Sequence, residues 1–75
     1  MAFQNIFFER LKSLRLSKNL KQSDIAAHIN VSVTQISDIE RGRRSTSVEN
    51  LIAIAEYFDV SLDYLVGRSD NPERR

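Results

Sequence analysis

The sequence predicts an all-α fold, in which five short helices form one compact bundle. Three observations support this fold class: no alternation of apolar and polar residues persists with a period of two, the chain has only two glycines, and five segments show helical periodicity or helix caps. A chain of 75 residues is long enough for one small core. We expect residues 1–67 to form the domain and residues 68–75 to form a frayed polar tail.

The first helix is predicted at about residues 5–18. Its inner side is defined by apolar residues spaced i, i+4 and i+7, namely Phe7, Leu11 and Leu14. Asn19 is expected to end the helix. Phe8 and Leu16 lie outside this apolar stripe, and the sequence gives them either no role, as for many scattered surface residues, or a role in a partner surface.

Residues 22–41 are predicted to form two short helices joined by a tight turn. Apolar residues recur with helical spacing at Ile25, Ala26 and Ile29, and again at Ile36 and Ile39. Asn30 tolerates the left-handed backbone conformation that a sharp turn after a helix requires, and Ser32 is a favourable N-cap for the second helix. The outer face of the second helix is polar and carries Thr34, Ser37, Asp38 and Arg41. We expect this face to be free to contact a partner.

The rest of the chain is predicted to form a loop and two further helices. Three arginines and Gly42 within residues 41–47 indicate a loop. Ser47 is expected to cap a fourth helix that ends near Asp59, and a brief fifth helix follows and stops at Gly67.

The charged residues are segregated along the chain, although the formal net charge is only +1. Residues 1–21 carry +4 and residues 41–44 carry +3, whereas residues 22–40 carry −3 and residues 45–66 carry −4. This layout is typical of a protein that presents one basic side to a polyanion and keeps its other side acidic. A mixed, solvated surface is the alternative that charge alone leaves open.

The composition argues against several other classes of protein. The chain has no cysteine and a single histidine, so neither a disulfide framework nor a metal site is expected, and His28 is interpreted as an ordinary surface or half-buried side chain. No apolar run is long enough to span a bilayer, and residues 1–8 lack the features of a signal peptide, so we expect no membrane contact and a cytoplasmic location. Without a nucleophile elbow, phosphate loop or paired carboxylates, the sequence indicates no enzyme, no cofactor and no small-molecule ligand.

The segment from residue 22 to residue 42 also carries a distinctive pattern of residues. The pattern consists of Gln22, Ile25, Ala26, Asn30, Val31, Ser32, Ile36, Ser37, Glu40, Arg41 and Gly42. At these positions the chain resembles the helix-turn-helix DNA-binding domains of phage repressors, Cro proteins and their bacterial relatives, the XRE-type transcriptional regulators. The resemblance covers residues 6–67 and implies a compact five-helix, λ-repressor-like fold with the helix-turn-helix at residues 22–41. Asn19 and Asn30 stand where the family often has glycine, and asparagine can adopt the same backbone conformation.

Arg15 and Glu40 lie beside the apolar stripes of their predicted helices, where an unpaired charge would be costly. A pair between them removes that cost, and the resemblance places a salt bridge at these two positions. Because desolvation offsets much of the Coulomb attraction, we expect this pair to position the second helix of the motif more than to stabilise the domain.

Contacts with DNA bases are predicted for the second helix of the motif, the recognition helix. The predicted residues are Val33, Thr34, Gln35 and Asp38. Val33 and the Thr34 methyl group can contact a thymine methyl group, Gln35 can pair with adenine, and Asp38 can accept a hydrogen bond from the amino group of cytosine. An acidic residue facing DNA also penalises general attraction to phosphates, so Asp38 is expected to serve discrimination more than affinity.

Contacts with the DNA backbone are predicted around the recognition helix, for Gln22, Ser32, Ser37, Arg41, Arg43 and Arg44. Arginine side chains match phosphate oxygens, and a loop that leaves the recognition helix lies along the backbone when that helix enters the major groove. For Gln22 the resemblance implies a contact with either the DNA backbone or a neighbouring residue of the recognition helix. A solvated side chain is the alternative.

The predicted function is sequence-specific binding of double-stranded DNA by a transcriptional regulator, a repressor that binds a palindromic operator as a homodimer. Tyr57 and Tyr64, together with Ile52, are the predicted dimer surface, because amphipathic aromatic residues favour interfaces and the family pairs at this end. Core packing is the rival explanation for both tyrosines. The alternative function is an antitoxin-like or scaffold module that uses the same bundle, and it would show an apolar outer face on residues 33–41.

Overall fold

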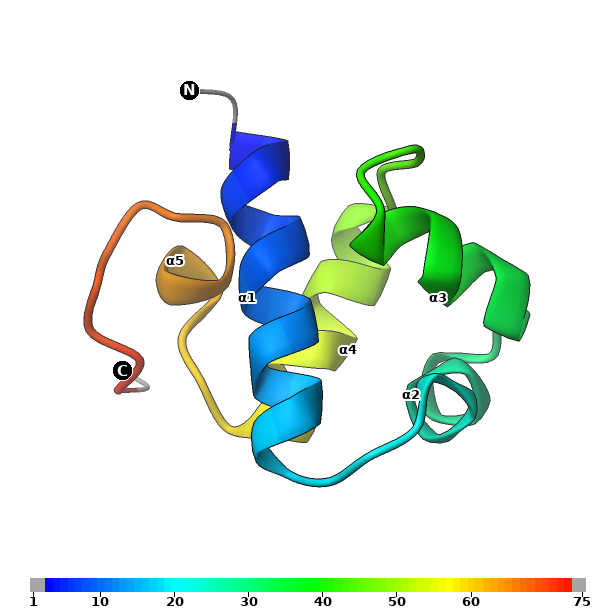
Figure 1. The fold of residues 1–75 in the computed structure, drawn as a ribbon. Helices are drawn as coiled ribbons and strands as arrows, with labels where there is room; N and C mark the ends of the chain where they lie inside the picture. Colours follow the sequence, from blue (N-terminus) through cyan, green and yellow to red (C-terminus); the bar gives the residue numbers. More distant parts are fainter. Residues whose placement is uncertain (1–2, 74–75) are drawn as a thin grey trace.

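The computed structural model describes the backbone of residues 3–73 and the side chains of residues 6–73, and this part of the chain is entirely helical apart from its turns and loops (Figure 1). The five helices are α1 (Phe3–Ser17), α2 (Gln22–Ile29), α3 (Val33–Glu40), α4 (Val48–Phe58) and α5 (Leu62–Leu65). The all-α prediction is confirmed, with α1 beginning two residues before its predicted start. Residues 1–2 and 74–75, at the ends of the predicted domain and tail, lie outside the described residues.

All five helices of the described region end in the same kind of turn. One residue, one or two positions past the end of each helix, has a left-handed backbone conformation. Its φ is 57° at Asn19, 59° at Asn30, 77° at Gly42, 56° at Asp59 and 86° at Gly67. In each turn an amide then donates to the carbonyl five residues earlier, as from Val31 to Ala26 at 2.9 Å. These bonds satisfy carbonyls that a helix end leaves without a partner, which is why short polar residues or glycine stop the helices here.

Three serines begin the later helices. The hydroxyl oxygens of Ser32, Ser47 and Ser61 accept hydrogen bonds from the amides of residues 35, 50 and 64, at 3.0 to 3.1 Å. Each bond satisfies one of the amides that a helix start leaves free. The N-caps predicted at Ser32 and Ser47 are therefore present.

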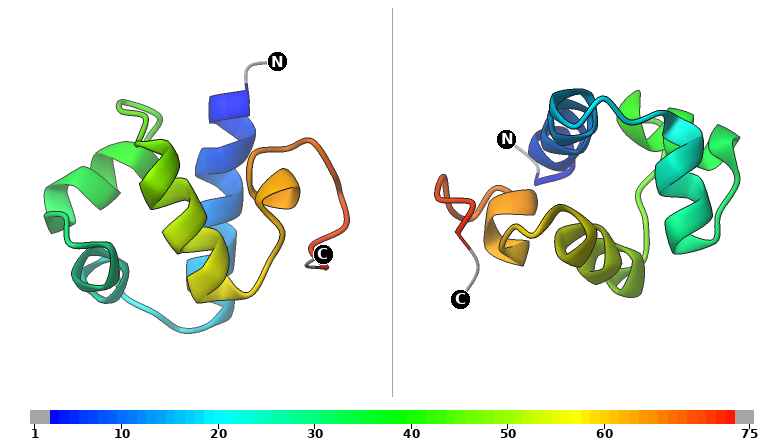
Figure 2. Two further views of the ribbon diagram at one scale, coloured as in Figure 1. Left: turned by 180° about the vertical axis from the view of Figure 1, so that it is seen from behind. Right: turned by 90° about the horizontal axis from the view of Figure 1, so that it is seen from below.

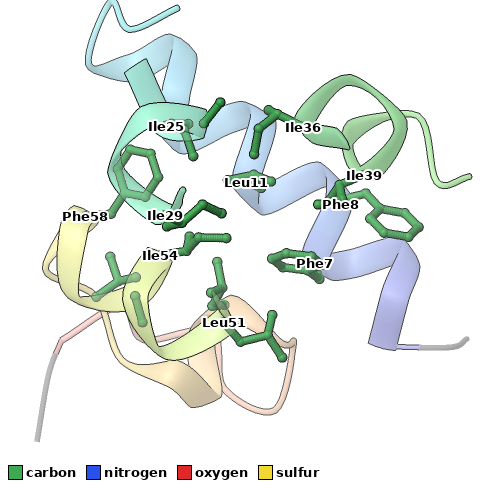
Figure 3. Close-up of a cluster of buried hydrophobic side chains, with 14 residues drawn as sticks. Phe7, Phe8, Leu11, Ile25, Ile29, Ile36, Ile39, Leu51, Ile54 and Phe58 are labelled. Carbon is green, nitrogen blue, oxygen red and sulfur yellow. The ribbon is translucent and has the colours of Figure 1, made fainter. Parts of the chain in front are cut away.

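The core lies between α1 on one side and α2, α3, α4 and α5 around it (Figure 3). Its buried members are Phe7, Phe8, Leu11, Ile25, Ala26, Ile29, Ile36, Ile39, Leu51, Ile54, Ala55, Phe58, Val60 and Leu65. The predicted stripe on α1 is buried at Phe7 and Leu11 and partly buried at Leu14.

Phe8 corrects the sequence-based interpretation of α1. Its side chain is only 7% exposed, whereas Leu16, the other apolar residue outside the stripe, is 55% exposed. The reason is that α1 contacts α3 and also contacts α5, so its buried side is wider than one apolar stripe. Burying a phenylalanine ring contributes about 1.5 to 3 kcal/mol, so Phe8 belongs to the core.

The polar tail is not frayed over residues 68–73. This segment turns back past α5 (Figure 2), where the carbonyl of Pro72 accepts a hydrogen bond from the Ser61 amide at 2.9 Å. The guanidinium of Arg10 donates to the carbonyls of Tyr64 and Ser69 and to Oδ1 of Asp70. The expectation of a frayed tail was wrong here because a side chain of α1, distant in sequence, holds the segment.

Candidate nucleic-acid interface

The helix-turn-helix is formed by α2, the turn at Asn30 and α3. Figure 1 views α2 nearly end-on while α3 runs across the picture, so the two helices cross at a steep angle. Ile25, Ala26 and Ile29 of α2 are buried, and Ala26 is small enough for a close approach of its neighbours. In all the views of Figures 1 and 2, α3 lies at the periphery of the molecule, which leaves its outer side open to a partner.

Arg15 and Glu40 join α1 to the C-terminal end of α3. Nε and Nη2 of Arg15 donate to Oε2 and Oε1 of Glu40, at 2.7 and 3.0 Å, and Nη1 donates to the Leu20 carbonyl at 3.0 Å. The side chains are 12% and 4% exposed, so the pair is screened from water. The hydrogen bonds to Glu40 raise the pKa of the Arg15 guanidinium, although burial acts in the opposite direction.

Gln22 extends this pair to the N-terminus of α2. Its Nε2 donates to Oε1 of Glu40 at 3.1 Å, so Glu40 accepts hydrogen bonds from both α1 and α2. A side-chain amide has two N–H donors, and one of those on Gln22 remains available to a phosphate. Of the two contacts implied for Gln22, the structure contains the one with the recognition helix.

The outer face of α3 combines one apolar residue with polar ones. Val33 is 46% exposed and Thr34 is exposed, whereas Ser37 and Asp38 are half-buried. The first turn of the helix therefore offers a methyl surface and a hydroxyl, and the next turn offers a carboxylate. This mixture suits base edges, which present methyl groups, donors and acceptors.

Gln35 and Ser32 are engaged with each other. The Ser32 amide donates to Oε1 of Gln35 at 3.2 Å, and the Gln35 amide donates to Oγ of Ser32 at 3.1 Å, which forms a capping box. A bidentate contact with adenine needs the amide oxygen as an acceptor. Within the capping box that oxygen already accepts one hydrogen bond, so the predicted adenine contact of Gln35 uses either its second lone pair or an opened box.

The arginine loop, residues 41–44, follows α3 directly. The amides of Arg41, Gly42 and Arg43 donate to carbonyls of α3 at 3.1, 3.0 and 2.8 Å. The side chains of Arg41, Arg43 and Arg44 are exposed. Three cations thus lie next to the polar face of α3, where they can meet the phosphates that flank a groove.

Phe8 lies beneath the arginine loop and has no counterpart in the sequence-based site. A methyl group added to Gly42 would lie 3.1 Å from Cδ2 and Cε2 of the Phe8 ring, so the ring lies close beside the loop backbone at this residue. The sequence gives little indication of this position, because Phe8 differs from the other apolar residues of α1 outside the stripe only in its size. Its position depends on how α3 is placed against α1.

The two tyrosines of the predicted dimer surface have partners within the chain. The centroids of the Tyr57 and His28 rings are 4.3 Å apart. Cζ of the Arg10 guanidinium lies 4.1 Å from the centroid of the Tyr64 ring. Both tyrosines are half-buried. Ile52 and Leu62, at 44% and 37% exposure, offer more open apolar surface at this end.

A hollow of about 540 Å³ lies beside these exposed residues, between α4, α5 and residues 69–73. Its lining includes the apolar residues Ile52, Ala55, Val60 and Leu62 and the acidic residues Glu56, Asp63 and Glu73. Within residues 3–73, no cluster of three or more histidine, cysteine or acidic side chains is placed to bind a metal ion. In the same part of the chain, no helix is long and apolar enough to cross a membrane.

The order of the helices, the steep pair α2 and α3 and the open polar face of α3 define a helix-turn-helix domain. Comparison with known proteins agrees, since a model of a helix-turn-helix family, HTH_3, matches residues 11–65. The chain belongs to this family, which is of the Cro/C1 type. The predicted family is confirmed, and because the family is one of transcriptional regulators, so is the prediction that the chain is not an enzyme.

Two relatives show how much of a longer protein the match covers. The HTH-type transcriptional regulator DdrOP3 of Deinococcus deserti is 38% identical over 58 residues, which are 77% of this chain and 45% of DdrOP3. The HTH-type transcriptional activator BcrR of Enterococcus faecalis is 40% identical over 60 residues, which are 80% of this chain and 29% of BcrR. The chain therefore spans less than half the length of either relative.

Two solved structures share the fold. The P22 c2 repressor in complex with a synthetic operator has a TM-score of 0.74 and 30% identity, covering 80% of this chain and 91% of the repressor. The restriction-modification controller protein C.Esp1396I, as a tetramer with its natural 35-base-pair operator, has a TM-score of 0.72 and 28% identity, covering 88% and 91%. These similarities confirm the λ-repressor-like fold.

Proposed function

We propose that this chain is a DNA-binding domain of a transcriptional regulator and that it binds duplex DNA sequence-specifically through α3. The observation that carries this proposal is the open polar face of α3 with the arginine loop at its end. When α3 enters the major groove, Val33, Thr34 and Asp38 meet base edges. Gln35 joins them through the second lone pair of its amide oxygen or with its capping box opened.

Contacts with the DNA backbone fix the depth and register of α3. Arg41, Arg43 and Arg44 reach phosphates beside the groove, and the free N–H of Gln22 reaches a phosphate at the positive end of the α2 dipole. Ser32, the N-cap of α3, and Ser37, on the outer face of α3, complete this set. Because these contacts are the same on any sequence, they contribute affinity and not preference.

Dimeric binding is the second part of the proposal. The described residues measure 28 × 24 × 22 Å, which is less than the roughly 34 Å between successive major grooves on one side of DNA. One copy therefore reads one half-site, and a homodimer reads a partly palindromic operator. We assign the dimer surface to the end that carries Tyr57, Tyr64 and Ile52.

Repression by occupancy is the regulatory mode that we infer, because it needs only the DNA-binding surface of this chain. A bound dimer covers about one turn of DNA on each side of its centre and excludes polymerase from it. Such a regulator acts in the cytoplasm, where bacterial DNA lies. An antitoxin-like or scaffold module is disfavoured, since on residues 33–41 Val33 is the one exposed large apolar residue.

Selection of bound duplexes from a random library tests the proposal. We expect one consensus sequence made of two inverted half-sites, and sedimentation of the complex at two chains per duplex. An enriched but non-palindromic consensus would contradict the dimer, and no enrichment at all would contradict sequence-specific binding.

A further inference from the structure

We propose that Phe8 is a positioning residue for the contact with DNA phosphates. Its ring supports the backbone of Gly42 and so fixes the direction in which the arginine loop presents its side chains. This inference rests on the proposed function, because it assigns to a core residue a share in DNA binding.

The Phe8 ring is packed closely against Gly42. Cδ2 and Cε2 of Phe8 would both lie 3.1 Å from a methyl group on Gly42, which is closer than an ordinary carbon contact. Gly42 has a φ of 77°, in the left-handed region. The ring therefore lies against the side of Gly42 from which a side chain would project, and it packs close to the loop backbone at this residue.

The ring is held in place by the rest of the core. Phe8 is 7% exposed, and its neighbour Phe7 lies with its ring 5.8 Å away from it and is 1% exposed. Figure 3 shows the Phe8 ring at the edge of the core nearest to α3. A ring fixed in this way is a rigid support, in contrast to a surface side chain.

Hydrogen bonds fix the loop backbone from its other side. Ser37, Asp38 and Ile39 of α3 accept from the amides of Arg41, Arg43 and Gly42, respectively, and these bonds tie the loop to the recognition helix. The ring of Phe8 ties the same turn to α1. The loop is thus held against two helices at the point where its direction changes.

The arginine side chains depend on this support because no other side chain of residues 6–73 holds them. Within that range, the side chains of Arg41, Arg43 and Arg44 make no hydrogen bond or ion pair. Three like charges within four residues also repel one another. The backbone therefore sets the point and direction from which each side chain leaves the loop, and α3 and Phe8 hold that backbone.

The test compares Phe8→Leu with Phe58→Leu in the full chain. Phe58 is 6% exposed and labelled at the opposite edge of the core in Figure 3, so the control removes the same ring atoms away from the loop. Both variants are titrated with a mixed-sequence duplex at several salt concentrations, at a temperature where circular dichroism shows each to be folded. Phe8→Met, whose longer and more flexible side chain can adapt to the space of the ring, replaces Phe8→Leu should the latter not fold.

We expect Phe8→Leu to weaken binding about 3- to 10-fold, the loss of part of one charge-assisted contact, and to lower the salt slope by up to about one. Phe58→Leu is expected to leave the salt slope unchanged. A merely structural role of Phe8 would lower the stability of the fold without changing the number of phosphates contacted.

A double-mutant cycle with Arg43→Ala completes the test. If Phe8 acts through the loop, Arg43→Ala weakens binding by a smaller factor in the Phe8→Leu background than in the unchanged chain. Equal factors in both backgrounds, or equal salt slopes for Phe8→Leu and Phe58→Leu, would overturn the role of Phe8. Failure of the unchanged chain to bind duplex DNA would instead overturn the proposed function.

Discussion

Arg15 of α1 and Glu40 of α3 are joined by two hydrogen bonds, at 2.7 and 3.0 Å, in a position where their side chains are 12% and 4% exposed. Glu40 also accepts from Gln22 of α2. One carboxylate thereby connects all three helices that determine where the outer face of α3 lies.

Arg15→Ala is expected to destabilise the domain by about 3 to 5 kcal/mol, because it leaves the buried Glu40 carboxylate without its charged partner. Thermal unfolding of the variant measures the loss. Lys12→Ala is the matched control, since Lys12 is an exposed cation on the same helix. The double variant Arg15→Ala/Glu40→Ala should lose less than the sum of the two single losses. Fully additive losses would mean that the pair is not coupled.

The two glycine turns are expected to differ in their tolerance of a side chain. A methyl group on Gly67 would lie 2.7 Å from Cγ2 of Ile6, whereas one on Gly42 would lie 3.1 Å from Phe8. Both alanine variants pay about 1 to 2 kcal/mol for a left-handed backbone, and Gly67→Ala also forces Ile6 to move. Denaturant unfolding should therefore show the larger loss for Gly67→Ala. Ile6→Ala should make Gly67→Ala less costly, and an unchanged cost would contradict the contact.

Arg10 is expected to hold the segment after α5 through main-chain carbonyls more than through its ion pair. Its guanidinium donates to the carbonyls of Tyr64 and Ser69, while the Asp70 side chain is fully exposed. Exposed ion pairs contribute little, so Asp70→Ala should leave the stability unchanged within error. Arg10→Ala should cost about 1 to 3 kcal/mol, because two carbonyls lose a charged donor.

Hydrogen exchange at the Ser61 amide tests whether the carbonyl bonds of Arg10 matter more than its ion pair. This amide reports on the segment because it donates to the Pro72 carbonyl. We expect faster exchange at Ser61 in Arg10→Ala and no change in Asp70→Ala. Equal acceleration in both variants would show that the ion pair is the anchor.

The helix ends could be predicted from the sequence because they depend on local interactions. Asn19, Asn30 and Gly67 end helices by their own backbone preference, and Ser32 caps α3 through a bond three residues away. Gln35 stands three residues after Ser32, so the sequence also carries the local pattern of the capping box that competes with its predicted adenine contact.

The features that the sequence did not predict depend on contacts between distant segments. Phe8 is buried because α3 and its loop close over α1, and no periodicity within α1 indicates this. Arg10 donates hydrogen bonds to Ser69 and Asp70, which lie 59 and 60 positions further along the chain. The Arg15–Glu40 pair also joins distant segments, 25 positions apart. It was expected because each charge lies beside an apolar stripe and needs a partner there, and because the family resemblance places a salt bridge at these two positions.

Competition titration against the selected duplex and a scrambled one, at several salt concentrations, tests whether α3 contacts bases while the arginine loop contacts phosphates. Arg43→Ala or Arg44→Ala should weaken both by a similar factor and lower the salt slope by about one. Asp38→Ala should relax the preference by about 1 to 3 kcal/mol at one base pair per half-site, and Thr34→Ala by less. Asp38→Ala should also tighten binding to the scrambled duplex, because it removes an anion that faces phosphates. If Asp38→Ala and Thr34→Ala leave the ratio of affinities unchanged while Arg43→Ala abolishes it, the assignment of the reading surface to α3 is wrong.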